Sequence, residues 1–246
     1  MPRPEAARAA SASIERSIVR CASVALVGLI LSGPIGIAIA GIHPQPAWSG
    51  PAAFVRAYHP LQAAPYFAGF LLVGGMVGLV AALAASAREE LRVRAYTALA
   101  LAGAFAALVF LNYTLQTTFV PALARTWSPE NGPLVAALSL SNPTSLGWAL
   151  EMWGYAVLGA STWLVAPVVR SSNASGRLAA ALFVANGTVS VVGGLSTALR
   201  PGWVMSGAGL ALFAGWNLLM AVMLASTIVA FHGRRWVVRP HLPTAP

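Results

Sequence analysis

Six long apolar segments, separated by short breaks that carry arginines, constrain this chain more than any other feature. Each segment is about long enough to cross a hydrocarbon core of ~30 Å as a helix. Only 9% of the residues are charged, against about 25% in an ordinary soluble domain, so a soluble globular fold is excluded. The sequence therefore predicts an all-α polytopic membrane protein, a single six-helix transmembrane bundle. Its spans are expected at 20–42, 66–86, 95–121, 143–169, 178–199 and 203–231, with flexible tails at 1–17 and 236–246.

The positions of the arginines predict how the chain is threaded. All 15 basic residues are arginines, and if the segments alternate across the membrane, all but Arg56, Arg125 and Arg200 fall on one side. Because short cytoplasmic loops are enriched in basic residues, both termini are expected in the cytoplasm of a bacterial cell, with the protein in its inner membrane. The net charge of +9 is then explained by topology and by contact with anionic lipid, and no nucleic-acid partner is expected.

The first segment has two interpretations. Arg16 and Arg20, the apolar run and then Ala38-Ile39-Ala40 have the layout of a secretory signal peptide with its small-residue cleavage site. The run is long for a signal peptide, however, and no soluble mature domain follows it. A retained first helix is therefore favoured over a cleaved signal.

Local signals predict how the helices start, bend and pack. Gly33-Pro34 indicates a kink in the first helix, and Gly74 with Gly78 indicates a close approach of a neighbouring helix. Asn142 as N-cap and Pro143 at the first helical position predict the start of the fourth helix. Between the spans, Pro51 to Tyr58 is expected to form a short interfacial helix, and Leu134 to Leu140 a re-entrant or interfacial segment that is too short to span.

Glu151 is the one charged residue inside the apolar segments, apart from Arg20 at the first boundary. An ionisable group at membrane depth is costly, so such a residue is a functional candidate by default. Burial favours the neutral acid, which can donate a hydrogen bond. Glu151 lies eight residues after Pro143, so it is expected roughly 12 Å from the outer end of its helix.

Polar residues on the third helix are expected at a similar depth. Asn112 and Gln116 are four residues apart and share one face, roughly 15 Å and 9 Å from the outer end of that helix. Glycines on the Glu151 face of the fourth helix mark that face as its packed side. The sequence thus predicts a ligand- or ion-binding constellation of Glu151 and Tyr155 facing Asn112 and Gln116.

A second pair of amides, Asn186 and Asn217, is predicted in the inner half of the membrane, close to each other. The simpler interpretation of all these polar groups is interhelical hydrogen bonding, worth about 0.6 kcal/mol per contact in membranes. Both interpretations remain open, with function favoured for Glu151 and a structural role for the amides.

Several kinds of chemistry are excluded or disfavoured by residue content. The absence of lysine excludes Schiff-base chemistry, and the absence of aspartate and of a phosphate-binding glycine loop argues against ATP-driven work. Cys21 is the single cysteine, so no internal disulfide can form. The four histidines are scattered without a second ligand at metal spacing. No metal and no cofactor are expected.

The block from Asn142 to Tyr155, with the sequence NPTSLGWALEMWGY, resembles part of a family of small bacterial multi-pass membrane proteins of uncharacterised function. The stretch from Phe183 to Gly194 is similar to that family too. The resemblance implies a helical bundle in the cytoplasmic membrane and carries no substrate or mechanism.

Three functions are consistent with these features. The first is small-solute or proton-linked transport or permeation, which predicts a water-accessible cavity that reaches Glu151. The second is a non-transporting membrane sensor or partner-binding protein, which predicts a sealed bundle with an exposed aromatic patch on the outer loops. The third is an intramembrane enzyme, which requires a second catalytic group beside Glu151, for which Tyr155 and His43 are the candidates. The glycine-rich faces suit either internal packing or a homo-oligomer.

Overall fold

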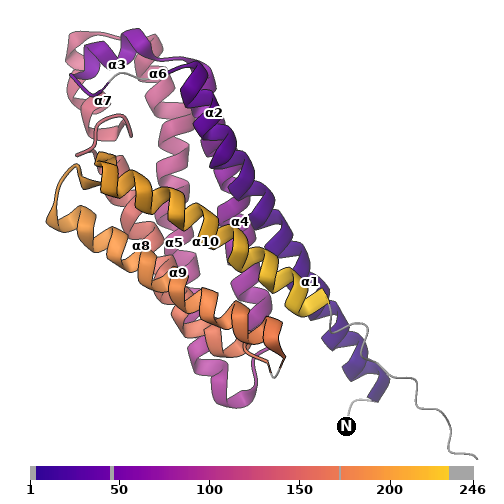
Figure 1. Cartoon of the computed structure of the whole chain (residues 1–246). Coiled ribbons are helices and arrows are strands. Elements are labelled where there is room, and N and C mark those ends of the chain that lie inside the picture. Colours follow the sequence, from indigo (N-terminus) through magenta and orange to yellow (C-terminus); the bar gives the residue numbers. More distant parts are fainter. Residues whose placement is uncertain (1–3, 45–46, 172, 233–246) are drawn as a thin grey trace, which may run out of the picture.

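The computed structural model describes residues 4–44, 47–171 and 173–232, and their regular secondary structure is entirely helical (Figure 1). Six stretches within these residues are long and apolar enough to cross a membrane, which is the architecture of a multi-pass membrane protein. They are Ala9–Ile42, Pro60–Ala85, Glu89–Arg125, Leu146–Val169, Ala174–Leu199 and Gly207–His232. The predicted all-α six-helix bundle is confirmed.

The spans are built from seven helices, because the first span consists of one long helix and a second helix of nine residues. These are α1 (Pro4–Ser32), α2 (Pro34–Ile42), α4 (Ala64–Ala85), α5 (Arg92–Thr114), α8 (Leu146–Val169), α9 (Ala174–Leu199) and α10 (Gly207–His232). Short helical segments connect or extend them: α3 (Pro51–Ala57), η1 (Pro60–Ala63), η2 (Glu89–Leu91), η3 (Leu115–Phe119), α6 (Val120–Arg125), η4 (Pro129–Asn131), α7 (Gly132–Leu138) and η5 (Trp203–Met205). The short helices α3 and α7 lie where the sequence predicts non-spanning segments between the spans.

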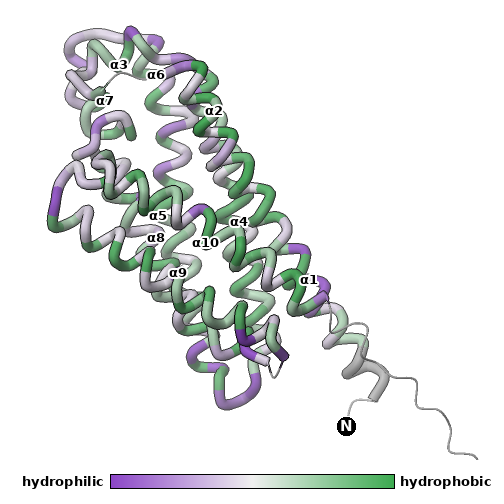
Figure 2. The backbone as a smooth tube through the Cα atoms, viewed as in Figure 1, coloured by the Kyte–Doolittle hydropathy of each residue, from purple (hydrophilic) through white to green (hydrophobic). Residues whose placement is uncertain are grey.

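The spans form a closed ring in sequence order. Each long helix packs against the next one, from α1 to α4, α5, α8, α9 and α10, and α10 packs back against α1. One end of the ring carries α3, α6, α7 and η5, and we call it the capped end (Figure 1). Hydrophilic residues gather mainly at the two ends of the bundle, and the spans between them are predominantly apolar (Figure 2). The apolar core fills the half of the ring away from the capped end, with Met76, Phe105, Leu158 and Met220 fully buried.

Several predicted helix boundaries differ from the structure: the fifth span begins at Ala174 rather than 178, and the sixth at Gly207 rather than 203. The fourth span starts at Leu146 rather than Pro143, because Ser145 is the N-cap and its hydroxyl accepts a hydrogen bond from the Trp148 amide at 3.3 Å. Asn142 instead holds the preceding turn, donating to the Ala136 carbonyl at 2.7 Å. The first helix begins at Pro4, so residues 4–17, expected in a flexible tail, are helical. The predicted tail at 236–246 lies outside the described residues.

The contact between α1 and α4 corrects one sequence prediction. A Cβ on Gly75 would lie 2.5 Å from the backbone nitrogen of Ala25, and one on Gly78 would lie 2.8 Å from the sulfur of Cys21. Gly74 has open space instead, so the close approach uses Gly75 and Gly78 rather than the predicted Gly74 and Gly78. The two glycines that meet α1 are thus three residues apart rather than four, with Gly78 common to the predicted and the observed pair. Buried residues along α1, including Ile18 and Leu29, pack in the apolar core.

The predicted kink at Gly33-Pro34 is present, since α1 ends at Ser32 and α2 begins at Pro34. Proline has no backbone N–H, so the helical hydrogen-bond ladder is interrupted there. The two pieces diverge in their environments: α1 contributes to the core, whereas α2 has no buried residue. The kink therefore turns the end of the first span away from the packed core.

Candidate functional site

Two glycines on α8 bring its polar face against α5. A Cβ on Gly154 would lie 2.5 Å from Val109, and one on Gly147 would lie 3.2 Å from the Asn112 side-chain oxygen. Both glycines are buried, in agreement with the predicted packed side of this helix. Glu151 lies between them on the helix, so the close approach presents its carboxyl group to the polar end of α5.

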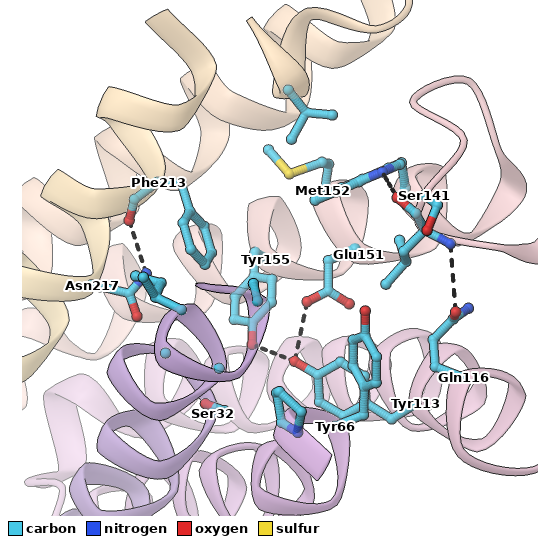
Figure 3. Close-up of a pocket in the computed structure, with 18 of the residues that line it drawn as sticks. Ser32, Tyr66, Tyr113, Gln116, Ser141, Glu151, Met152, Tyr155, Phe213 and Asn217 are labelled. Atoms are coloured by element: carbon cyan, nitrogen blue, oxygen red, sulfur yellow. Dashed lines mark hydrogen bonds between the residues drawn. The ribbon is translucent and has the colours of Figure 1, made fainter. Parts of the chain in front are cut away.

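The carboxyl group of Glu151 accepts two hydrogen bonds from α5. The Asn112 amide donates to Oε2 at 2.8 Å. The Tyr113 hydroxyl donates to Oε1 at 3.1 Å, as Figure 3 shows. Asn112 and Tyr113 are themselves buried, with 0% and 5% of their surface exposed. The two oxygens of one carboxyl group are thus held by two consecutive residues of the neighbouring helix.

The donors converge on Glu151 in two chains. Because a tyrosine hydroxyl has a single hydrogen, Tyr113 donates it to Glu151 and must accept from Tyr155, whose hydroxyl lies 3.0 Å away. On the other side, the Gln116 amide donates to the Asn112 oxygen at 3.2 Å. Both chains end on the carboxyl group as acceptor, which is the arrangement that suits a carboxylate.

Gln116 links this network to the backbone of the capped end. Its side-chain amide donates to the Leu138 carbonyl at 2.8 Å, and its oxygen accepts from the Leu140 amide at 3.5 Å. The Trp148 indole N–H donates to the Leu140 carbonyl at 2.7 Å from α8. Gln116 itself lies in η3, a π-helical turn, and such turns recur at functional sites. The segment after α7 is therefore pinned over the site from both α5 and α8.

A cavity of about 400 Å³ opens beside Glu151, within the range typical of small-molecule sites. It lies toward the capped end of the ring, and every one of the six spans contributes to its walls (Figure 3). Glu151, Tyr155, Tyr113 and Gln116 form a polar wall, together with Tyr66. Trp216 closes the inner side of the cavity, where its ring meets that of Tyr155 at 4.8 Å between centroids. The cavity thus ends on the Glu151 network.

The structure brings the four residues of the predicted outer site together, but their hydrogen bonds differ from a direct contact of each residue with Glu151. Asn112 contacts Glu151 directly, whereas Gln116 reaches it only through Asn112, and Tyr155 only through Tyr113. Tyr113 is the residue that the sequence analysis did not select. The sequence did contain the information needed to select it. Tyr113 follows Asn112 directly and lies three residues before Gln116, next to the same face of the helix.

The predicted inner pair is not joined by a hydrogen bond that the structure gives, because Asn186 and Asn217 have different partners. The Asn186 amide donates to the Thr162 hydroxyl of α8 at 3.4 Å, and its oxygen is buried without a hydrogen-bond partner among the described residues. Asn217 donates to the Phe213 carbonyl in its own helix and lies against Gly33 at the kink. The angular positions of the two side chains about α9 and α10 separate them, and Asn217 lines the outer cavity instead.

Two further groups lie near the cavity at the capped end. His43, a candidate partner for Glu151 in catalysis, lines the cavity while its ring stacks on His59 at 3.7 Å between centroids. Tyr58 also lines it, and burial raises the pKa of the Tyr58 hydroxyl, partly offset by the positive charge of Arg125. Tyr58 therefore keeps its proton at neutral pH. Within the described residues, no group of three metal-ligating side chains lies together.

Comparisons of the chain with protein-family models, with curated proteins and with solved structures found no match. The function is therefore inferred from the residues and geometry of the site.

Proposed function

We propose that the protein transports, or allows the permeation of, a small solute that binds at Glu151, with proton exchange at that carboxyl group. One observation carries this proposal: the cavity of about 400 Å³ that all six spans line reaches Glu151, the one carboxyl side chain inside the predicted apolar segments. An intramembrane carboxyl group that reaches a cavity is typical of solute and proton pathways. A bundle that used Glu151 only as a packing contact would have no need of a cavity there.

The network fits a binding step that can be linked to a proton. The two donor chains from Tyr155 and Gln116 occupy part of the carboxylate, and the side of Glu151 toward the cavity remains for a solute donor or a proton. The ion pairs Arg88–Glu90 and Arg92–Glu89 lie around η2, at the end of the bundle opposite the cap and away from Glu151. A proton or a donor group on the solute would then complete the site.

Threading supports access from outside the cell. Arg88, Arg92, Arg94, Arg170 and Arg177 belong to the end opposite the cap, and Arg56, Arg125 and Arg200 to the capped end. Because basic residues are enriched in cytoplasmic loops, this distribution supports a topology with the capped end outside the cell and both termini in the cytoplasm, with the protein in a bacterial inner membrane. The arginine clusters would contact anionic headgroups on the cytoplasmic side.

A second function, ligand sensing without transport, is favoured by the opposite half of the bundle. The core beyond Trp216 is packed with fully buried apolar side chains such as Met76 and Leu158. Transport requires this half to open in another conformation, whereas a sensor does not. The glycine-rich helix faces also suit a homo-oligomer, in which ligand binding to one copy would be passed on to its neighbours.

The experiment that separates the two functions measures flux in proteoliposomes. Swelling in glycerol, urea and methylammonium, and proton uptake driven by a potassium diffusion potential, would be followed for the wild type, Glu151→Gln and Glu130→Gln. Glu130 is an exposed carboxylate at the capped end and controls for the loss of one charge. We expect flux above that of empty liposomes, lost in Glu151→Gln and kept in Glu130→Gln. Flux equal to that of empty liposomes, or unchanged by Glu151→Gln, would contradict transport.

A further inference from the structure

The ring of spans has a weak side next to the cavity, between α2 and α10. The first and the last span approach each other closely at the kink, where a Cβ on Gly33 would lie 2.5 Å from the side-chain oxygen of Asn217 in α10. Beyond it, α2 packs mainly on α4 and η1, whereas α10 packs on α9 and η5. The two helices diverge toward the capped end (Figure 1). The backbones of α2 and α10 therefore separate beyond the kink (Figure 1).

The residues on the two sides of this gap are apolar, line the cavity and are exposed at the same time. Ile37 of α2 is 61% exposed and Phe213 of α10 is 44% exposed. Ile37 lies five residues before the end of the first span, and Phe213 six residues after the start of the last, each roughly 8 Å below the capped end of its helix. At that depth the opening faces the hydrocarbon part of a bilayer rather than water.

The interior of the cavity is amphipathic. Glu151, Tyr113, Gln116 and Tyr155 gather on the wall formed by α5, η3 and α8. The walls toward the gap carry the apolar residues Ile37, Leu212 and Phe213, and the polar residues Ser32 and Asn217 lie at the inner edge of the gap, beside the kink. Among the described residues that line the cavity there is no arginine, and His43 is the only one whose side chain can carry a positive charge. An anionic group beside Glu151 would therefore be buried next to a carboxyl group without a fixed counter-charge, which is unfavourable.

We infer that the solute of the proposed function is an amphiphile with a single apolar chain, whose neutral or cationic head donates a hydrogen bond to Glu151. Its chain leaves the cavity between Ile37 and Phe213 into the bilayer, and the molecule enters sideways from the lipid. This inference rests on Glu151 being a binding site, as proposed above. Long-chain alcohols and amines fit the head that the site selects, and fatty acids do not.

The test uses the full-length protein in lipid nanodiscs and three photoreactive probes that differ only in the head: a long-chain alcohol, the matching amine and the matching fatty acid. Each carries a diazirine on the part of the alkyl chain next to the head, which stays inside the cavity. Crosslinked residues are mapped by mass spectrometry. Ile37→Trp narrows the gap, and Ile35→Trp is its matched control, because Ile35 is 43% exposed on the same helix and does not line the cavity.

We expect the alcohol and the amine to label Met152, a residue inside the cavity, several-fold more than the fatty acid does. Ile37→Trp should reduce that labelling several-fold, and Ile35→Trp should leave it unchanged. Equal labelling of Met152 in the two tryptophan variants, or equal labelling by the fatty acid, overturns the inference. The flux measurement is independent of the labelling experiment. If no flux is found but Met152 is labelled and Ile37→Trp reduces that labelling, only the transport function is rejected. If Glu151-dependent flux is found without such labelling, only the inference of an amphiphilic solute is rejected.

Discussion

The hydroxyl groups of Tyr113 and Tyr155 lie 3.0 Å apart, and this contact joins α5 to α8 beside the carboxyl group of Glu151. Tyr113 is the centre of the arrangement, because its single hydrogen goes to Glu151 at 3.1 Å while its oxygen accepts from Tyr155. Its ring also packs against Tyr66 and Phe70 of α4. One side chain thus ties three spans to the candidate site.

Tyr113→Phe is expected to destabilise the protein more than Tyr155→Phe. The first change removes two hydrogen bonds and the second removes one. At the average of about 0.6 kcal/mol per interhelical hydrogen bond in a membrane, Tyr113→Phe should cost about 1 kcal/mol and Tyr155→Phe about half as much. Reversible unfolding in mixed detergent micelles measures both. Equal losses would show that the Tyr113–Glu151 bond contributes nothing to stability.

Gln116→Leu should release the segment that follows α7. Gln116 holds this segment through the Leu138 carbonyl and the Leu140 amide, and leucine offers neither bond. Hydrogen exchange of peptides covering residues 132–145 is expected to become faster, with the spans unchanged. Thr117→Val is the matched control, since the Thr117 hydroxyl bonds to Tyr113 and Thr114 carbonyls in its own helix. A similar acceleration in both variants would argue against this role for Gln116.

Gly75→Ala should be destabilising, and Gly74→Ala should not. A Cβ on Gly75 would meet the Ala25 backbone at 2.5 Å, whereas nothing lies within 4 Å of one on Gly74. Overpacking of this kind typically costs about 1–3 kcal/mol. The thermal midpoint in detergent, read by tryptophan fluorescence, compares the two variants. If Gly74→Ala were the damaging change, α4 would meet α1 through the face that the Gly-x-x-x-Gly spacing predicts.

The orientation of the bundle can be read from two matched cysteines. Glu130 lies in η4 at the capped end and Glu90 in η2 at the other, and both are exposed. In a Cys21→Ser background, Glu130→Cys should react with a membrane-impermeant maleimide in intact spheroplasts. Glu90→Cys should react only after the membrane is permeabilised. The reverse pattern would place the capped end, and with it the entrance to the cavity, in the cytoplasm.

The sequence by itself determined the six spans and the candidate residue Glu151. A bilayer accepts only segments that satisfy their own backbone and hide few charges, so hydropathy along the chain is sufficient to find them. The depth of Glu151 and Asn112 followed from the fixed rise of a helix. Their direct contact follows from two further features that the sequence contains, the glycines at 147 and 154 that let α5 approach α8.

Only the tertiary structure decided how each helix is rotated about its axis and which neighbour it meets. Gly75 rather than Gly74 lies against α1, and Asn217 lies at the kink while Asn186 bonds to α8. Both placements depend on the rotation of a helix about its axis, which a nearly uniform apolar surface does not encode. The role of Tyr113 and the gap between α2 and α10 arise in the same way. Because lipid is as apolar as a leucine side chain, hydropathy gives no preference for one face, and close packing of all six helices together fixes the rotation.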